Sequence, residues 1–349
     1  MMSIQESIND YSGKGLTGLA NLGNTCFINS TIQCLSHTYE LNNFLNKQTY
    51  KKRLNKIPES LLLIEWDKLR QLIWSENCII KPSGFLSAVH KVANVKDRDI
   101  FTGWAQNDLT EFMNFLFTSF HESIKREVEM NIKGNIENST DKLAKSCYTM
   151  MKNMYSKEYS ELLKMFYGIH VSKVKSLESD YLNTIPEPFF TLQVPIPSQE
   201  AISLEDCIDL YTVKEKLSDD EKILNEKTGK REEATKQILF WNLPNVLIII
   251  LKRFSNDNVK NTNLIDFPLE NFNLSKYVVG YNKQSYIYDL YGICNHVGGV
   301  NGGHYYSYVK NANEKWYNFN DTSVSEIKNT NHLKTDKAYC FFYRKKILQ

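Results

Sequence analysis

The spacing of apolar residues predicts that the first part of the chain is helical. Residues 58–74 and 107–128 carry apolar side chains at intervals of three and four. An α-helix with this repeat turns one face toward a core. We therefore expect helices between residue 24 and about residue 165, interrupted by the polar segment 131–146, which we expect to form a loop.

From about residue 169 the pattern becomes that of β-strands. Short runs rich in β-branched and aromatic residues replace the helical repeat, which is typical of strands. These runs cover residues 189–196, 245–254, 286–297, 304–310, 315–319 and 338–345. The highly charged segment 212–237 interrupts them, and we expect it to protrude into solvent. Helices followed by strands predict an α+β fold.

Composition and charge narrow the classes of function. The 349 residues are 42% hydrophobic and 23% charged, as in ordinary globular proteins. A net charge of +2 provides no excess of positive charge that would indicate binding to nucleic acid or to an anionic membrane. The longest apolar run, 246–251, is far shorter than a membrane span. Residues 1–15 contain acids and no apolar signal segment, so we do not expect secretion.

The cysteines indicate a reduced, intracellular protein. They number seven, an odd count, and they are widely spaced. This pattern does not predict a disulfide framework, and the chain has no C-x-x-C pair to serve as zinc ligands. We therefore expect neither a structural metal nor a cofactor.

The stretch 21–30, NLGNTCFINS, contains the first candidate for chemistry. Gly23 and Asn24 suit a tight turn, and Asn24 or Thr25 is suited to cap a following helix. A helix N-terminus points unpaired N–H groups at a neighbouring sulfur, which lowers the pKa of a thiol and activates it as a nucleophile. Cys26 is therefore a candidate nucleophile. The alternative, that it packs as a small core residue, stays open on this stretch alone.

A nucleophilic thiol needs a base and a group that orients the base. His296 and His304 flank a segment with four glycines, 298–303, between two strand-like runs. A long hairpin turn would explain either histidine, and their spacing does not choose between them. Asn320 and Asp321, at the end of a short aromatic strand, are candidate orienting groups, although each also suits an ordinary turn.

The combination of these stretches resembles the ubiquitin-specific proteases, which are papain-like cysteine peptidases. Residues 18–35 resemble the cysteine box of that family, and residues 288–310 with 316–324 resemble its histidine box. Three further signatures follow the family order, at residues 105–116, 243–254 and 266–277. The resemblance extends from about residue 16 to residue 345.

The resemblance implies a role for each ambiguous position. Cys26 matches the family's nucleophile, and His304, rather than His296, matches its base. Asn320 matches the residue that orients the base. Asn21 matches the side-chain donor to the oxyanion, and Asp321 matches a second acid that supports the site.

The resemblance also implies the substrate. The family hydrolyses the (iso)peptide bond after the C-terminal Gly-Gly of ubiquitin, through an acyl-enzyme on the cysteine. The positions that match contacts with this tail are Gln106, Asp108, Glu111, Tyr305, Gly302 and Gly303. The glycine-rich segment 298–303 is then expected to form a mobile rim that closes over the tail.

The implied architecture is a single catalytic domain over residues 1–349. It is an α+β, papain-like cysteine peptidase fold with three parts. We expect a helical thumb at about 16–165, β fingers at about 166–245 and a β-rich palm at about 246–349.

The chain departs from the family in the fingers. Relatives commonly hold zinc there with two C-x-x-C pairs, which would fall within residues 170–182 and 224–237. Neither segment contains cysteine. We therefore expect no zinc, and fingers that are held by strand pairing and packing or that are shortened.

The sequence thus predicts a thiol-dependent ubiquitinyl hydrolase of the ubiquitin conjugation pathway. Its expected partners are ubiquitin or ubiquitinated proteins, without nucleic acid or a membrane span. We expect a monomer in the cytoplasm, the nucleus or both. The alternatives are a protease for another ubiquitin-like modifier and a non-catalytic ubiquitin-binding scaffold.

Overall fold

The computed structural model describes residues 8–103, 105–255, 257, 259–299 and 302–347. The chain divides into two compact units. The first unit comprises Met1–Lys125, Ile249–Asp266 and Leu290–Tyr343, and the second comprises Arg126–Ile248, Phe267–Asp289 and Arg344–Gln349. The chain therefore enters each unit more than once.

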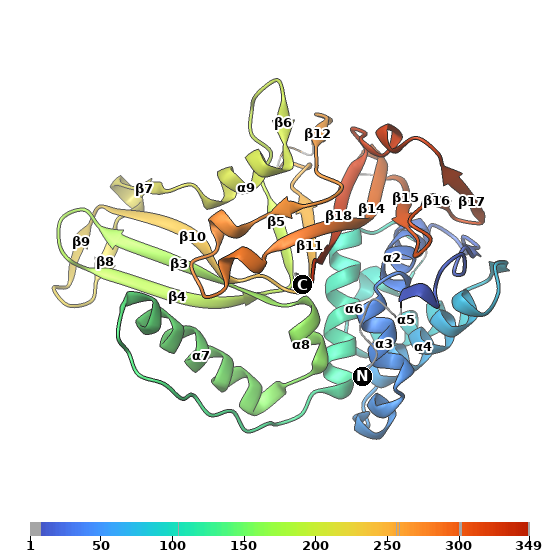
Figure 1. Cartoon of the computed structure of the whole chain (residues 1–349), viewed down its shortest axis with the longest axis horizontal. Helices are drawn as coiled ribbons and strands as arrows, with labels where there is room; N and C mark the ends of the chain where they lie inside the picture. Colours follow the sequence, from blue (N-terminus) through green and yellow to red (C-terminus); the bar gives the residue numbers. More distant parts are fainter. Residues whose placement is uncertain (1–7, 104, 256, 258, 300–301, 348–349) are drawn as a thin grey trace. The chain divides into compact units, whose positions relative to one another are not determined.

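The helices of the first unit confirm the apolar repeats in the first part of the sequence (Figure 1). They are α2 (Cys26–Ser36), α3 (Tyr39–Asn46), α4 (Glu59–Ser75), α5 (Ser83–Val95) and α6 (Leu109–Ile124). Trp66 of α4 joins three of them, because its ring lies 6.1 Å from that of Phe85 in α5 and 6.0 Å from that of Phe120 in α6. These aromatic contacts form much of the helical core.

Helix α2 is buried on every side rather than on one face. All eleven of its residues are buried, and it packs against α6 on one side and against two strands on the other. Several of its buried polar side chains donate to backbone oxygens. Gln33 Nε2 donates to Thr17 O at 2.8 Å, and Thr31 Oγ1 donates to Phe27 O at 2.8 Å. A residue at the start of α2 is therefore held firmly.

The longer strands that lie wholly or partly in the first unit form one sheet. Their order is β17 (Ser323–Ile327), β16 (Trp316–Asn320), β15 (Gly302–Lys310), β14 (Ile287–Gly299), β18 (Ala338–Lys345) and β11 (Val246–Leu251). The pairs β14–β15, β15–β16 and β16–β17 are antiparallel. These strands confirm the β-rich character predicted for the last third of the chain. In the same unit, β1 (Gly18–Leu19), which precedes α2, forms a short parallel pair with β2 (Ile79–Ile80), which follows α4.

The second unit contains a four-stranded sheet and three helices (Figure 1). The strand order is β4 (Leu182–Phe189), β3 (Gly168–Ser176), β10 (Ala234–Asn242) and β7 (Glu215–Leu217). The helices are α7 (Ser139–Glu158), α8 (Glu161–Phe166) and α9 (Leu204–Thr212). A small core joins α7 to the sheet through Cys147, Val171 and Trp241.

Two predictions for the second unit need correction. Residues 139–146 belong to α7 rather than to a loop, because Asn138 and Asp141 form a capping box that starts the helix early. The charged segment 212–237 is not simply a solvent-exposed excursion. It contains β7, the hairpin of β8 (Ile223–Asn225) and β9 (Lys230–Glu232), and the start of β10, with several side chains buried.

The remaining elements are short. They are β5 (Thr191–Val194), β6 (Ile202–Ser203), β12 (Ile265–Asp266), β13 (Phe272–Asn273) and the 3₁₀ turns Thr49–Arg53, Asp99–Phe101, Asp219–Glu221, Ser275–Tyr277, Lys283–Ser285 and Thr330–Leu333. Among the described residues, no helix combines the length and the apolar character needed to cross a membrane. The mixture of helices and antiparallel sheets confirms the α+β class, while the division into thumb, fingers and palm stays a prediction.

Candidate active site

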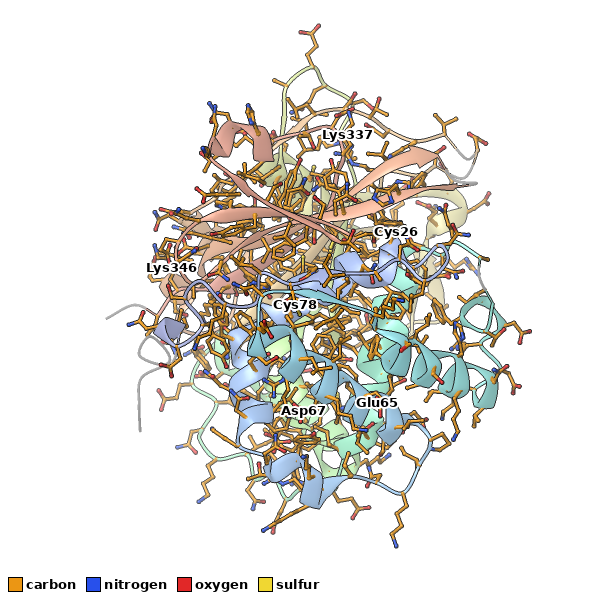
Figure 2. The ribbon with its side chains drawn as sticks, turned by 90° about the vertical axis from the view of Figure 1, so that its right-hand side faces the viewer. Cys26, Glu65, Asp67, Cys78, Lys337 and Lys346 are labelled. Atoms are coloured by element: carbon orange, nitrogen blue, oxygen red, sulfur yellow. The ribbon has the colours of Figure 1, made fainter. Side chains whose placement is uncertain are left out.

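The expected nucleophile, Cys26, is the first residue of α2 (Figure 2). The preceding turn has a positive φ at Gly23 (103°) and at Asn24 (52°). Glycine and asparagine adopt this left-handed region at the lowest cost. The turn and the helix start predicted at this stretch are therefore confirmed.

Thr25 is the N-cap residue of α2, but its side chain does not cap the helix. Its Oγ1 accepts the Leu22 N–H at 3.0 Å and donates to Asn21 Oδ1 at 3.3 Å. The expectation of a Thr25 side-chain cap is therefore wrong, because the hydroxyl is used to close the turn. The backbone N–H groups of Cys26 and Phe27 lie against the sulfur instead.

Burial dominates the electrostatics of the thiol. Cys26 is 2% exposed, and this desolvation raises the pKa of the thiol above its ordinary value. The charge of Asp321 raises the pKa further, whereas hydrogen bonds from the backbone of Tyr305, Phe27 and Cys26 itself lower it. The expectation that the helix start alone yields a low thiol pKa is wrong for this conformation, because the lowering groups do not outweigh burial.

The expected base and its orienting group form a direct pair on neighbouring strands. His304 Nε2 lies 2.6 Å from Asn320 Oδ1, between β15 and β16. An amide oxygen only accepts, so the hydrogen of the neutral ring is on Nε2. Nδ1 of His304 then carries a lone pair and is able to accept a proton.

The thiol and the imidazole belong to packed neighbours. Helix α2 packs against β15, and the sulfur of Cys26 contacts the backbone N–H of Tyr305, the residue after His304. Among the described residues, Cys26 and His304 share no hydrogen bond. In this state the proton of the thiol therefore has no direct path to the ring.

His296, the alternative base, is already engaged. It lies opposite Tyr305 in the β14–β15 ladder, with the two ring centroids 4.5 Å apart. Lys260 Nζ donates to His296 Nδ1 at 3.0 Å. Burial, followed by the charge of Lys260, lowers the pKa of His296 to about 4. Such an imidazole is a weak base at neutral pH, so the geometry favours His304.

Asn21 and Asp321 are joined directly. Asn21 Nδ2 donates to Asp321 Oδ2 at 3.0 Å, and Asn21 Oδ1 accepts the N–H groups of Gly23 and Thr25, each at 3.1 Å. Both ends of the amide are therefore held. Because an amide nitrogen carries two hydrogens, one N–H of Asn21 remains for an incoming acceptor.

Asn29 is a member of this network that the sequence did not reveal. Its Nδ2 donates to Asp321 Oδ1 at 2.8 Å from one turn along α2. Leu19 N also donates to Asp321 O at 2.8 Å, which ties β1 to the same residue. Asn29 is one of several polar residues in α2, so its residue type did not single it out, and its partner is 292 positions away in the chain.

A cleft of the first unit brings together most of the expected substrate-binding residues. Its lining includes Gln106, Asp108, Gly302, Gly303 and Tyr305. Glu111 is exposed on α6 and is not part of this lining. The sequence analysis missed two aromatic residues of the cleft, Phe254 and Tyr339, and it considered a third, His296, only as a base.

Gln106 bridges the cleft. Its Oε1 accepts the N–H of Gly303 at 2.6 Å, and its Nε2 donates to Gly303 O at 2.6 Å. In an antiparallel strand pair, the N–H and C=O of one residue make the same two bonds to the residue opposite. The Gln106 amide thus occupies a strand position that an extended peptide would otherwise take.

Asp108 has two structural tasks in addition to any contact with substrate. Its Oδ1 accepts the N–H of Thr110 at 2.8 Å and so caps α6. Its Oδ2 accepts the hydroxyls of Tyr339 at 2.8 Å and Tyr305 at 3.5 Å. Burial raises the pKa of both tyrosines, so both remain phenols that donate to the carboxylate.

The rim of the cleft requires glycine at position 303. A Cβ on Gly303 would lie 2.3 Å from Val297 O and 2.4 Å from His296 Nε2. The expected mobile rim, 298–303, includes residues 300 and 301, which lie outside the described residues. Its mobility stays a prediction.

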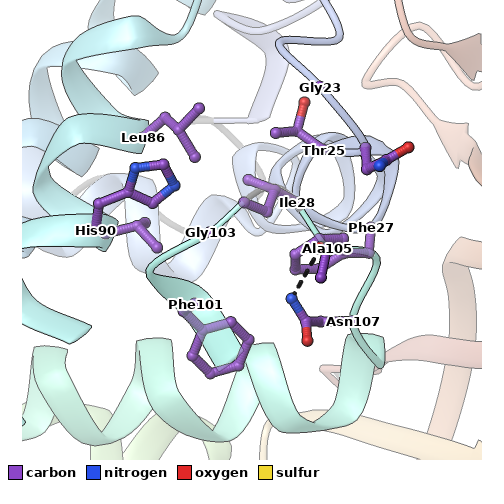
Figure 3. A pocket seen from close by; sticks show the side chains of 12 residues that line it. Gly23, Thr25, Phe27, Ile28, Leu86, His90, Phe101, Gly103, Ala105 and Asn107 are labelled. Atoms are coloured by element: carbon purple, nitrogen blue, oxygen red, sulfur yellow. Dashed lines mark hydrogen bonds between the residues drawn. The ribbon is translucent and has the colours of Figure 1, made fainter. Parts of the chain in front are cut away.

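A second, smaller pocket lies beneath the turn that precedes Cys26. Figure 3 shows Leu86 and His90 of α5 on one side of it and Thr25 and Ile28 on the other. Asn107 Nδ2 donates to Ala105 O at 3.0 Å at its edge. The turn and the segment that carries Gln106 therefore line the same pocket.

The fold together with this arrangement of thiol, imidazole and amide defines the class of papain-like cysteine peptidases. The profile described as "Ubiquitin carboxyl-terminal hydrolase" matches residues 17–343. The chain belongs to the ubiquitin carboxyl-terminal hydrolase family.

Curated relatives agree with this assignment. The chain is 32% identical over 351 residues to Ubiquitin carboxyl-terminal hydrolase 2 of Bos taurus, covering 97% of this chain and 56% of that protein. It is 33% identical over 342 residues to the protein of the same name from Gallus gallus, covering 95% and 93%. The chain thus spans about half the length of the bovine relative.

Solved structures agree on the fold. A chain of the SAGA DUB module of Ubp8, Sgf11, Sus1 and Sgf73 bound to monoubiquitin superposes with a TM-score of 0.74 at 25% identity. The match covers 96% of this chain and 70% of that chain. The papain-like fold expected from the sequence is therefore confirmed.

Proposed function

We propose that the chain is a thiol-dependent ubiquitinyl hydrolase that cleaves the (iso)peptide bond after the C-terminal Gly-Gly of ubiquitin. The observation that carries the proposal is the 2.6 Å pair of His304 and Asn320 on strands packed against the helix that begins at Cys26. Family membership supplies the substrate class.

The proposed mechanism follows from the free lone pair on His304 Nδ1. This nitrogen accepts the thiol proton while the sulfur of Cys26 attacks the carbonyl carbon of the last glycine. The tetrahedral oxyanion accepts hydrogen bonds from the Asn21 side chain and the Cys26 backbone N–H. The imidazolium then protonates the leaving amine, and an acyl-enzyme forms. Water, deprotonated by the same ring, releases ubiquitin and restores the thiol.

Because the pKa of Cys26 is raised, the proposed mechanism has to include transfer of the thiol proton to a base. A buried thiol does not ionise alone, because a lone thiolate would be poorly solvated. Transfer to His304 creates a thiolate–imidazolium pair that compensates both charges. We infer that substrate binding brings the two side chains into hydrogen-bonding contact. Asn320, being neutral, holds the ring but stabilises the imidazolium less than a carboxylate would.

We propose that the cleft beside Gly303 receives the extended tail. The paired amide of Gln106 gives way there to a substrate residue in extended conformation, whose own N–H and C=O can make the same two bonds to Gly303. Asp108 and Glu111 are placed on the same helix start to attract basic residues of the tail. Tyr305 and Gly302 complete the proposed contacts.

The remaining assignments are also proposals. We propose a monomer that uses a thumb, fingers and palm to hold ubiquitin and acts in the cytoplasm, the nucleus or both. All seven cysteines are free, which supports a reducing compartment.

Hydrolysis of a ubiquitin C-terminal fluorogenic amide tests the activity. We expect wild-type turnover and its loss in Cys26→Ala, with mass spectrometry placing a ubiquitin suicide probe on Cys26. Cys78→Ala is the matched control, because Cys78 is the exposed free cysteine and lies outside the site. Turnover that survives Cys26→Ala would falsify the assignment.

Two alternatives give different outcomes in the same assay. A protease for another ubiquitin-like modifier would react with a probe made from that modifier and not with the ubiquitin probe. A non-catalytic scaffold would bind ubiquitin without reacting with any probe. The presence of Asn21, Cys26, His304 and Asn320 together favours the hydrolase.

A further inference from the structure

A buried carboxylate forms the centre of a polar cluster at one end of the second unit. Glu232, the last residue of β9, is 5% exposed. Its Oε2 accepts the hydroxyls of Ser176 and Ser179, each at 2.6 Å. Its Oε1 accepts Asn225 Nδ2 at 2.8 Å and the Thr228 hydroxyl at 3.5 Å. Four side chains thus donate to one carboxylate.

The four donors come from two turns with the same spacing. Ser176 and Ser179 lie three positions apart at the end of β3, and Asn225 and Thr228 lie three positions apart in the β8–β9 hairpin. Figure 1 shows this hairpin at the far end of the β3 and β4 ribbons.

Each turn also holds its own donors in place. Ser176 Oγ accepts the backbone N–H of Ser179 at 3.1 Å. In the hairpin, Asn225 Oδ1 accepts the N–H of Lys227 at 3.0 Å, and Gly229 takes a positive φ of 69°. The donors therefore point inward without help from a ligand.

The cluster does not fit the zinc that relatives of the resembled family hold at the corresponding segments. A zinc ion needs inward-facing lone pairs on thiolates or imidazoles. Here neutral hydroxyls and an amide direct hydrogens inward, and a negative charge occupies the centre. The polarity of the site is the reverse of that of a metal site.

We propose that Glu232 takes the place of a metal ion and organises a metal-independent clasp of Ser176, Ser179, Asn225 and Thr228. The clasp joins the β3–β4 turn to the β8–β9 hairpin, two segments that are about 50 residues apart in the chain. The hydrogen bonds hold the pKa of Glu232 below its ordinary value, with Ser176 as the largest cause, so the carboxylate is ionised at neutral pH. This inference does not depend on the proposed hydrolase activity.

Hydrogen exchange measured by mass spectrometry tests the clasp. Glu232→Gln keeps the size of the side chain but removes its charge and replaces one acceptor by a donor. We expect exchange in the peptides covering 170–182 and 223–233 to become at least about tenfold faster, with exchange in the first unit unchanged. The matched control is Glu233→Gln, whose carboxylate makes a more exposed ion pair with Lys216 at 2.8 Å. Equal exchange in the two variants would overturn the proposal.

Metal content gives a second test. Wild-type protein, purified without chelators, is expected to carry no stoichiometric zinc by elemental analysis, and a chelator is expected to leave exchange of both turns unchanged. One zinc per chain, or a chelator-induced loss of protection, would contradict the proposal.

The reciprocal experiment converts the clasp into a metal site. Ser176→Cys, Ser179→Cys, Asn225→Cys and Thr228→Cys are combined with Glu232→Ala, which empties the centre. If the four positions surround one point, this variant is expected to bind one Co²⁺ per chain with the absorption of tetrahedral thiolate ligands. A variant whose first unit keeps wild-type exchange but which binds no Co²⁺ would show that the positions do not share a centre.

Discussion

Two carboxylates, one in each unit, connect segments that are far apart in the sequence. Asp321 in the first unit accepts the side-chain amides of Asn21 and Asn29, about 300 positions away. Glu232 in the second unit accepts donors from two turns at shorter range. Both use each of their oxygens, and both therefore fix several side chains with one charge.

The two networks differ in whether a hydrogen-bond donor is left over after the carboxylate is paired. The carboxylate of Glu232 is buried, and each of the four other clasp residues donates a hydrogen bond to it. The Asp321 network is only half-buried, and one N–H of Asn21 is left over beside a buried thiol. The same hydrogen-bonding chemistry thus produces a closed structural centre in one unit and an open network at the proposed active site in the other. The second N–H of Asn21 is what distinguishes the proposed active site from the Glu232 clasp.

Loss of the Asp321 carboxylate is expected to have the largest effect. Asp321→Ala removes the anchor of the Asn21 amide, and kcat on a ubiquitin C-terminal amide is expected to fall about 100-fold, the usual effect of one lost oxyanion donor. Asn21→Ala is expected to have a similar effect. The double variant is then no slower than either single variant, because both act through one donor. Independent, multiplicative losses would contradict this coupling.

The pH dependence of thiol reactivity is the next effect in size. Because the pKa of Cys26 is raised, the thiol form persists at neutral pH and the thiolate appears only as pH increases. Alkylation of the free protein by iodoacetamide is expected to accelerate about tenfold per pH unit below that pKa, without a plateau between pH 7 and 9. Peptide mapping distinguishes Cys26 from Cys78. A plateau near pH 7 would show that the free protein already holds a thiolate.

The orienting bond of His304 is expected to contribute less. Asn320→Ala removes one neutral hydrogen bond, worth about 1 kcal/mol, and kcat is expected to fall about fivefold. Asn320→Asp keeps the acceptor and adds a charge that stabilises the imidazolium, so its kcat is expected to match or exceed that of wild type. A larger loss in Asn320→Asp than in Asn320→Ala would show that the residue does not act by holding the ring.

The sequence predicted the elements better than the contacts between them. The helical repeat at 58–74 and the aromatic run at 338–345 were confirmed as α4 and β18, because burial of one face or one strand is a local pattern. Residues 139–146 were misjudged, since their polar composition hid the capping box that begins α7.

For the candidate site, too, the sequence predicted local features better than contacts between distant residues. A thiol at a helix start was visible in the turn before Cys26, but the choice of His304 over His296 needed the family resemblance. In the structure that choice depends on the burial of His296 and on Lys260, which contacts His296 from a separate segment. Asn29 and Glu232 were missed because their partners are remote. For Glu232 the signal was present as two equally spaced polar pairs, in the two segments where the family resemblance implies zinc ligands.

The smallest expected effect is the acid sensitivity of the Glu232 clasp. The pKa of Glu232 is depressed in the folded protein, so its stabilising contribution is complete above the ordinary glutamate pKa of about 4.3 and is lost as pH falls through the folded value. Glu232→Gln cannot ionise and lacks this contribution at every pH. The difference in Tm between wild type and Glu232→Gln is therefore expected to be about 2 °C at pH 7 and to shrink below pH 4. Glu233→Gln should track wild type more closely. A difference that stays constant down to pH 3 would mean that shape rather than charge holds the two turns together, and the parallel with Asp321 would then fail.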